Sequence, residues 1–282
     1  MKHILLVITF LFSSSSLTAQ DNFETGQNKT NPGIISNIGS DAVSFYKTSI
    51  SFIESPLHFD SEDFLITGII TGATALSFTL DNPIRKEVKT IHSPSMDKIT
   101  NVGKKLGAGE YGLALSGVLY LSGQITQDSE LRKTGVMLAE AIFLNGITTE
   151  LLKIVIGRSR PYTNEGFDMD PFNMSFNDDE NSLPSGHTST AFTIATVLSE
   201  RIDNTFASIA LYSFAGLTAF ERIYADRHWF SDTVLGAAIG TIVGLKVVKL
   251  NSEYESQCSS VKWNVTPVFS HGSFGVGVVL NF

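Results

Sequence analysis

Apolar residues gather in long stretches that are separated by polar connections. They occupy residues 64–80, 111–125, 134–156, 187–198, 205–220 and 231–250. Each stretch has the length of a helix, is rich in Ala, Gly and Leu, and shows few strand signals. The pattern predicts an all-α fold, a bundle of about six core helices.

Two further segments carry weaker helical signals, and a third predicts a loop. Residues 83–106 are charged and amphipathic, which predicts a connector helix with irregular ends, and a short helix is expected over 41–55. Residues 162–183 are polar and acidic but include Phe167, Phe172 and Phe176. Loops of this length are often lids. A lid whose phenylalanines meet an apolar substrate and a solvated crossover are equally good interpretations.

The two ends of the chain have patterns of their own. Lys2, an apolar core at 4–12 and small residues up to Ala19 predict a secretory signal peptide over 1–20. A polar linker with a possible short helix follows over 21–60, and the helical domain covers 61–250. In the tail, 251–282, apolar and polar residues alternate on both sides of a turn at 270–272, which predicts a small C-terminal β-hairpin.

Composition narrows the class of protein. The 282 residues carry a formal net charge of -8, which argues against nucleic-acid binding. Mean hydropathy is +0.13, between the values of ordinary soluble enzymes and polytopic membrane proteins. Cys258 is the single cysteine, so no intramolecular disulfide is expected despite the signal peptide, and no lipoprotein anchor is expected either.

Three short segments carry the candidate chemistry, and the first supplies two cations. Lys153 and Arg160 are seven residues apart, which places them on one face of a helix. Pro161 disfavours helical geometry at the preceding residue, so the helix is expected to end with Arg160 at its rim.

The second and third segments supply histidines. Pro184-Ser185-Gly186-His187 precedes an apolar stretch, so Ser185 is the expected N-cap of a helix whose first N–H groups can bind an anion. In the third segment, which begins at Arg222, His228 and Asp232 are four residues apart. The carboxylate can then reach one ring nitrogen and leave the other as a nucleophile or base.

Together these segments resemble the type 2 phosphatidic acid phosphatase superfamily, which also holds bacterial non-specific acid phosphatases and vanadium haloperoxidases. The family pattern is Lys, six residues, Arg-Pro; then Pro-Ser-Gly-His; then Ser-Arg, five residues, His, three residues, Asp. All three parts occur here in order, and the resemblance covers roughly residues 109–249. One position departs: Glu221 stands where the family has Ser.

The resemblance implies phosphoryl transfer through a phosphohistidine. His228 would attack phosphorus, Asp232 would orient it, and His187 would protonate the leaving oxygen and then activate water. The phosphoryl oxygens would be held by Lys153, Arg160, Ser185, Gly186 and Arg222. No carboxylate cluster with metal-ligand spacing lies nearby, so no metal or other cofactor is expected.

The resulting expectation is an exported, metal-independent phosphatase that acts on phosphomonoesters or pyrophosphates, with a lipid-linked phosphate preferred. The alternatives are a soluble periplasmic acid phosphatase, a vanadate-dependent haloperoxidase, and an envelope protein with a vestigial site. If the first three apolar stretches all spanned a membrane after signal cleavage, residues 153–160 would emerge in the cytoplasm. Lipid-pathway enzymes of the family work on the outer face, so the expected enzyme faces the periplasm and is membrane-associated, with at least one stretch not spanning.

Overall fold

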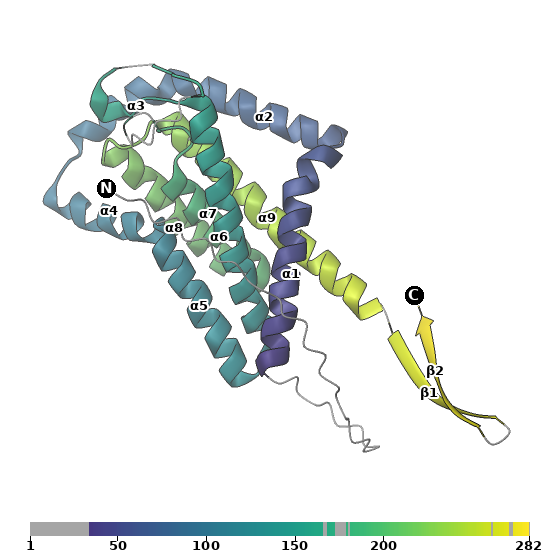
Figure 1. Cartoon of the computed structure of the whole chain (residues 1–282). Helices are drawn as coiled ribbons and strands as arrows, with labels where there is room; N and C mark the ends of the chain where they lie inside the picture. Colours follow the sequence, from purple (N-terminus) through teal and green to yellow (C-terminus); the bar gives the residue numbers. More distant parts are fainter. Residues whose placement is uncertain are drawn as a thin grey trace, which may run out of the picture.

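A computed structural model describes residues 34–165, 168–172, 179, 181–260, 262–270 and 273–281. The predicted signal peptide and the start of the predicted linker lie outside these residues. Figure 1 shows the order of the elements, which are α1 (Ile34–Glu54), α2 (Ser61–Ser77), α3 (Asp81–Thr90), α4 (Pro94–Leu106), α5 (Gly109–Thr126), α6 (Ser129–Ile156), α7 (Gly186–Ile202), α8 (Thr205–Tyr224), α9 (Phe230–Ser260), β1 (Lys262–Ser270) and β2 (Ser273–Asn281), with short 3-10 turns η1 (Ser55–His58), η2 (Phe78–Leu80) and η3 (Pro161–Thr163).

The all-α bundle predicted from the sequence is confirmed. The six apolar stretches form α2 and α5 to α9. The connector predicted as one helix over 83–106 is two helices, because Ser93 and Pro94 start a new one: the Ser93 hydroxyl accepts a hydrogen bond from the Met96 amide, and Pro94 occupies the first turn. The short helix expected over 41–55 is longer and begins at Ile34.

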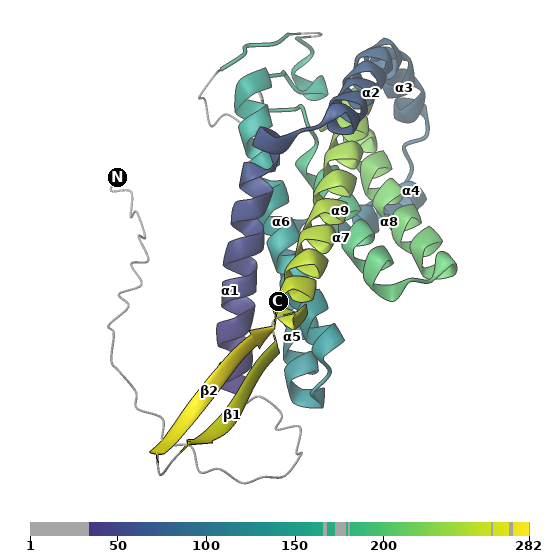
Figure 2. The ribbon, with the colours of Figure 1, turned by 90° about the vertical axis from the view of Figure 1, so that its right-hand side faces the viewer.

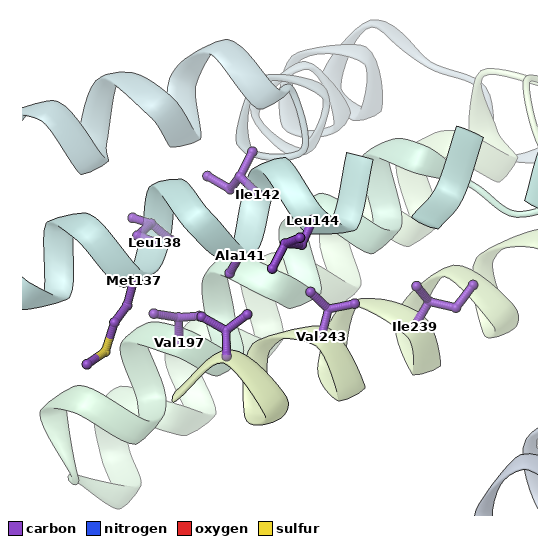
Figure 3. Close-up of a cluster of buried hydrophobic side chains, with 9 residues drawn as sticks. Met137, Leu138, Ala141, Ile142, Leu144, Val197, Ile239 and Val243 are labelled. Carbon is purple, nitrogen blue, oxygen red and sulfur yellow. The ribbon is translucent and has the colours of Figure 1, made fainter. Parts of the chain in front are cut away.

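The core lies where α6, α7 and α9 meet. Figure 3 shows its buried side chains, which are Met137, Leu138, Ala141, Ile142, Leu144, Val197, Ile239, Val243 and Val247. α9 approaches α7 through glycines spaced four residues apart. A Cβ on Gly236 would stand 2.7 Å from the Ser185 carbonyl oxygen, and one on Gly240 would stand 2.1 Å from the Ser189 carbonyl oxygen. This close approach fixes the start of α7 against α9.

The N-terminal helices pack around this core. α1 lies along α6 and α9 (Figure 2), where the carboxylate of fully buried Glu140 accepts hydrogen bonds from Thr48, Ser49 and Asn251. α2 and α3 lie across one end of the bundle (Figures 1 and 2). α3 is held there by ion pairs from Arg85 and Lys89 to Asp226, in the turn after α8.

Beyond α9 the chain continues as β1 and β2, which pair antiparallel with Ser270 opposite Ser273. They form no part of the helical core described above. The hairpin as a folded unit packed on the domain or on a partner stays a prediction.

Three segments of the described chain are long and apolar enough to cross a membrane: Ser61–Thr90, Ser129–Ile156 and Phe230–Cys258. Among their exposed apolar side chains are Phe64, Leu65 and Ile69 of α2. The stretch at 111–125, in α5, does not meet the same criterion within the described residues.

Candidate active site

A cavity of about 650 Å³ lies where α4, α6 and α8 end and α5 and α7 begin; it is called the site cavity below. Its walls bring together most of the predicted site residues: Lys153, Arg160, Gly186, His187, Arg222 and His228. Ser185 and Asp232 are fully buried and do not line it. The three sequence segments therefore converge on one place, with two of their members behind the wall.

Lys153 and Arg160 reach the site cavity from different elements. The expectation that they share a helix face is wrong, because α6 ends at Ile156 and Gly157 caps it with a φ of +59°. Arg160 follows in extended backbone, as expected before a proline. Lys153 stays on the last turn of α6, and its Nζ lies 3.6 Å from where a Cβ on Gly186 would stand.

His228 is oriented mainly by a backbone carbonyl. Its Nδ1 lies 2.8 Å from the Ser182 carbonyl oxygen and 3.5 Å from Asp232 Oδ2. A carbonyl can only accept, so Nδ1 carries the proton and Nε2 keeps the lone pair. The contact with Asp232, predicted from a spacing of one helical turn, is thus the longer of the two. His228 lies before α9, which begins at Phe230, so the two residues do not share a helix. Burial lowers the pKa of His228, and Asp232 opposes this effect.

Asp232 is bound by a shell of donors. Arg158 Nη1 donates to Oδ1 at 2.6 Å, while the Trp229 amide, at 2.8 Å, and the Ser182 hydroxyl donate to Oδ2. Arg158 is 1% exposed. Since Ser182 also provides the carbonyl that His228 uses, the carboxylate and the histidine are positioned by the same residue.

A second carboxylate extends this shell to α3. Asp81 accepts from Arg158 Nη2 at 2.7 Å and from both the amide and the hydroxyl of Ser231, at 2.8 and 2.7 Å. Asp81 is 3% exposed. Sequence reasoning missed Arg158 and Asp81. Arg158 lies inside the first motif, but its partner Asp81 is 77 residues away, so the local sequence gives no signal of the pair.

His187 lies in the first turn of α7 and is partly exposed to the site cavity. Burial, reinforced by the positive charges of Arg222, Lys153 and Arg160, lowers the pKa of His187 to about 3. The imidazole is therefore neutral at pH 7 in this structure. An anion placed among the same cations would favour the protonated form.

Ser185 has the expected position but not the expected contact. It is the N-cap residue of α7, yet its side chain makes no capping hydrogen bond. Its hydroxyl instead lies 3.0 Å from the Thr188 hydroxyl, and its amide donates to the Asp232 carbonyl oxygen at 3.0 Å. Ser185 thus joins the start of α7 to α9 behind the site cavity.

The site cavity holds more charge than the motifs predicted. Lys104 and Arg227 also line it, as do Glu150 and Glu221. Arg227 lies over the ring of Tyr162, 5.1 Å from its centroid. Among the described residues, no group of three or more His, Cys, Asp or Glu is placed to hold a metal ion.

The predicted lid falls partly outside the described residues, as do Phe167, Phe176, Asp178 and Glu180. Within the described part, the Phe172 side chain is 74% exposed. The amide of Arg160 donates to the Asp179 carbonyl oxygen at 2.8 Å, so one point of the loop is attached next to the site. A lid that contacts substrate stays a prediction.

Comparison with known families identifies the domain. Residues 134–254 match the model of the PAP2 superfamily. The chain carries a PAP2 superfamily domain. The match covers α7, α8 and most of α6 and α9, and with them Lys153, Arg160, Arg222, both histidines and Asp232. Asp81 and Lys104 lie outside it.

Two curated relatives come from Porphyromonas gingivalis. The chain is 47% identical over 66 residues to its Lipid A 1-phosphatase, covering 23% of this chain and 15% of the relative. It is 26% identical over 117 residues to its Lipid A 4'-phosphatase, covering 41% of this chain and 50% of the relative. The chain thus spans half or less of the length of these relatives.

Two solved structures match parts of the chain. The first transmembrane PAP2-type phosphatidylglycerolphosphate phosphatase from Bacillus subtilis matches with a TM-score of 0.51 and 17% identity, covering 76% of this chain and 95% of that one. Aquifex aeolicus LpxE matches with a TM-score of 0.47 and 28% identity, covering 60% and 95%. The first likeness shows that the bundle has the fold of a transmembrane PAP2 phosphatase. The three segments that are long and apolar enough to cross a membrane indicate membrane association.

Proposed function

We propose that this chain is a lipid phosphatase that hydrolyses phosphomonoesters or pyrophosphates through a phosphohistidine at His228. One observation carries the proposal: the Nδ1–H of His228 is committed to the Ser182 carbonyl, which leaves the lone pair on Nε2 of a histidine that lines a cavity together with several cations. A nucleophile of fixed tautomer, surrounded by charges that match a phosphoryl group, is what such a transfer requires.

The first half-reaction moves the phosphoryl group to the enzyme. Nε2 of His228 attacks phosphorus, the bond from phosphorus to the leaving oxygen breaks, and that oxygen takes a proton from His187. Lys153, Arg160 and Arg222 line the same cavity, where they balance the charge on the phosphoryl oxygens. The binding of the phosphate dianion raises the pKa of His187 above its value in the structure, which supplies the acid.

The second half-reaction returns the enzyme to its starting state. Water attacks phosphorus, His187 accepts a proton from that water, and the phosphorus–nitrogen bond breaks to release inorganic phosphate. No step needs a metal ion, since side-chain cations hold the charge that Mg²⁺ balances in other phosphoryl transfers. Asp232 and Arg158 act through His228 rather than on phosphorus, because both are buried behind the cavity wall.

A lipid substrate is proposed because the site adjoins apolar helices and because the two curated relatives are named for lipid A. We further propose that the site faces the periplasm, as the signal peptide and helix parity predict. A soluble, non-specific acid phosphatase is the second candidate, since the cations recognise only the phosphoryl group.

The test is a substrate panel assayed with detergent-purified protein in excess EDTA. It compares lipid A, phosphatidic acid, isoprenyl pyrophosphate and a chromogenic phosphate ester, with His228→Ala as the matched control. Phosphate release that needs His228, persists in EDTA and favours one lipid supports the proposal. Activity that is lost in EDTA and restored by Mg²⁺ or Zn²⁺ would refute the metal-free mechanism. Equal rates on all substrates would favour the acid phosphatase.

A further inference from the structure

Glu221 is the position where the chain departs from its family pattern, and it lies at the site. It belongs to the last turn of α8, is 4% exposed, and lines the site cavity beside Arg222. The family has a neutral Ser at this position, so this chain places a carboxylate in the wall of an anion site.

The Glu221 carboxylate contacts the cation next to it twice. Its Oε2 accepts a hydrogen bond from Nε of Arg222 and forms an ion pair with Nη2 of the same side chain. This edge of the guanidinium is one that a phosphoryl group would use for two parallel hydrogen bonds. The two anions therefore compete for the same donors.

The surroundings of Glu221 are strongly charged. Lys104 from α4 and Arg227 from the turn after α8 act on it besides Arg222. The other charged or titratable groups around the same cavity are Glu150, Lys153, Arg160, His187 and His228. Burial raises the pKa of the Glu221 carboxyl, and Arg222, Lys104 and Arg227 oppose the rise. As pH falls through that pKa, the carboxyl becomes neutral and stops repelling an anion.

We propose that Glu221 competes with the phosphoryl group for Arg222 and so limits how tightly the site holds inorganic phosphate, the product. The inference rests on the proposed function for the identity of that anion. A site with several cations and no opposing charge would retain a phosphate dianion after hydrolysis. A carboxylate on the key guanidinium supplies an alternative partner at the moment when the product leaves.

The experiment measures the dissociation constant of inorganic phosphate by calorimetry, from pH 5 to pH 8, for wild type, Glu221→Gln and Glu221→Ser. The control is Glu150→Gln, which removes the same charge from the same cavity. Glu150 also pairs with a cation, Lys153 at 2.7 Å, but its side chain is 64% exposed and therefore screened by water.

Both Glu221 variants are expected to bind phosphate about tenfold more tightly than wild type at pH 8. As pH falls, the ratio of the wild-type dissociation constant to that of Glu221→Gln should shrink toward one, because the wild-type carboxyl is then neutral too. The ratio is used because the titration of phosphate itself affects both proteins equally and cancels. Glu150→Gln should change the constant by less than about twofold.

Weaker phosphate binding in both Glu221 variants would overturn the inference, because it would mean that Glu221 only holds Arg222 in place. An equal change in Glu150→Gln would overturn it as well, since it would reduce the effect to general charge. Phosphate binding is measured without turnover, so this result is separate from the test of the proposed function. The proposed function fails if the wild-type protein releases no phosphate from any ester.

Discussion

At the scale of single residues, hydrogen bonding rather than charge leaves Nε2 of His228 as the ring nitrogen with the lone pair. The Ser182 carbonyl holds the proton on Nδ1 of His228, and the Ser182 hydroxyl holds Asp232. A carbonyl contributes no charge, so the lone pair on Nε2 is preserved while Asp232 remains near enough to stabilise an imidazolium. Sequence spacing predicted Asp232 as the partner; a main-chain acceptor 46 residues away has no side-chain signature.

His228→Ala removes the proposed nucleophile, so turnover should fall at least about 10³-fold while vanadate binding stays within a fewfold of wild type. Asp232→Asn should cost less activity, because it disturbs orientation and not the attacking atom. The measurement is kcat on a chromogenic ester beside vanadate inhibition. His58→Ala, a change at an exposed histidine outside the site cavity, is the control. Wild-type turnover in His228→Ala would rule out the covalent mechanism.

The pKa of His187 provides a second test at this scale. Burial and neighbouring cations lower it to about 3, so this imidazole is neutral at pH 7. Bound vanadate adds negative charge among those cations, which favours protonation and should raise the pKa by more than about two units. The measurement is an NMR titration of labelled histidine with and without vanadate, with His187→Gln to assign the signal. An unchanged titration curve would remove His187 as the general acid.

At the scale of elements, the ends of helices position the predicted site residues. α6 ends at Ile156 with Gly157 as its cap, and the chain then turns Arg158 inward to the carboxylates and Arg160 toward the site cavity. The pattern of apolar residues predicted the helices, and the motifs predicted that the three segments form one site. Both predictions were possible because both signals are local in the sequence. The Arg158–Asp81 pair was not predictable, since it joins α3 to the site through side chains of two distant segments.

Gly157→Ala should damage the site although no predicted catalytic residue changes. Its backbone has a φ of +59°, and an added Cβ would stand 1.8 Å from the Asp170 carbonyl oxygen. The strain of about 1–3 kcal/mol, plus that clash, should lower the thermal midpoint and kcat together. Gly216→Ala, where a Cβ meets nothing within 4 Å, is the control and should be neutral. Equal behaviour of the two variants would contradict the role given to this helix end.

At the scale of the whole molecule, the site lies at one end of the bundle. Lys153 is near the last residue of α6 and Asp232 is near the first residue of α9, and both helices belong to segments able to cross a membrane. If the two span in opposite directions, the motifs meet at one membrane face. The direction of that face comes only from the signal peptide and parity, which makes it a prediction.

A reporter that is active only in the periplasm, fused after Leu183, should give signal, because that junction lies between the first and second motifs. The protein should also stay with membranes after a high-salt wash, since salt screens charges but does not release apolar helices. Activity of a cytoplasm-only reporter at the same junction would reverse the orientation. Full recovery of the enzyme in a detergent-free wash would instead favour the soluble phosphatase.

The most direct test of the account is capture of the phosphoenzyme. Protein is mixed with a ³²P-labelled chromogenic ester in EDTA, quenched within milliseconds and mapped by peptide. The good leaving group needs little acid, so His187→Asn should still form the intermediate but hydrolyse it slowly. A base-stable, acid-labile label is expected on the peptide that contains His228, stronger in His187→Asn and absent in His228→Ala. Steady release of labelled phosphate with no label on His228 in any of these proteins would contradict it.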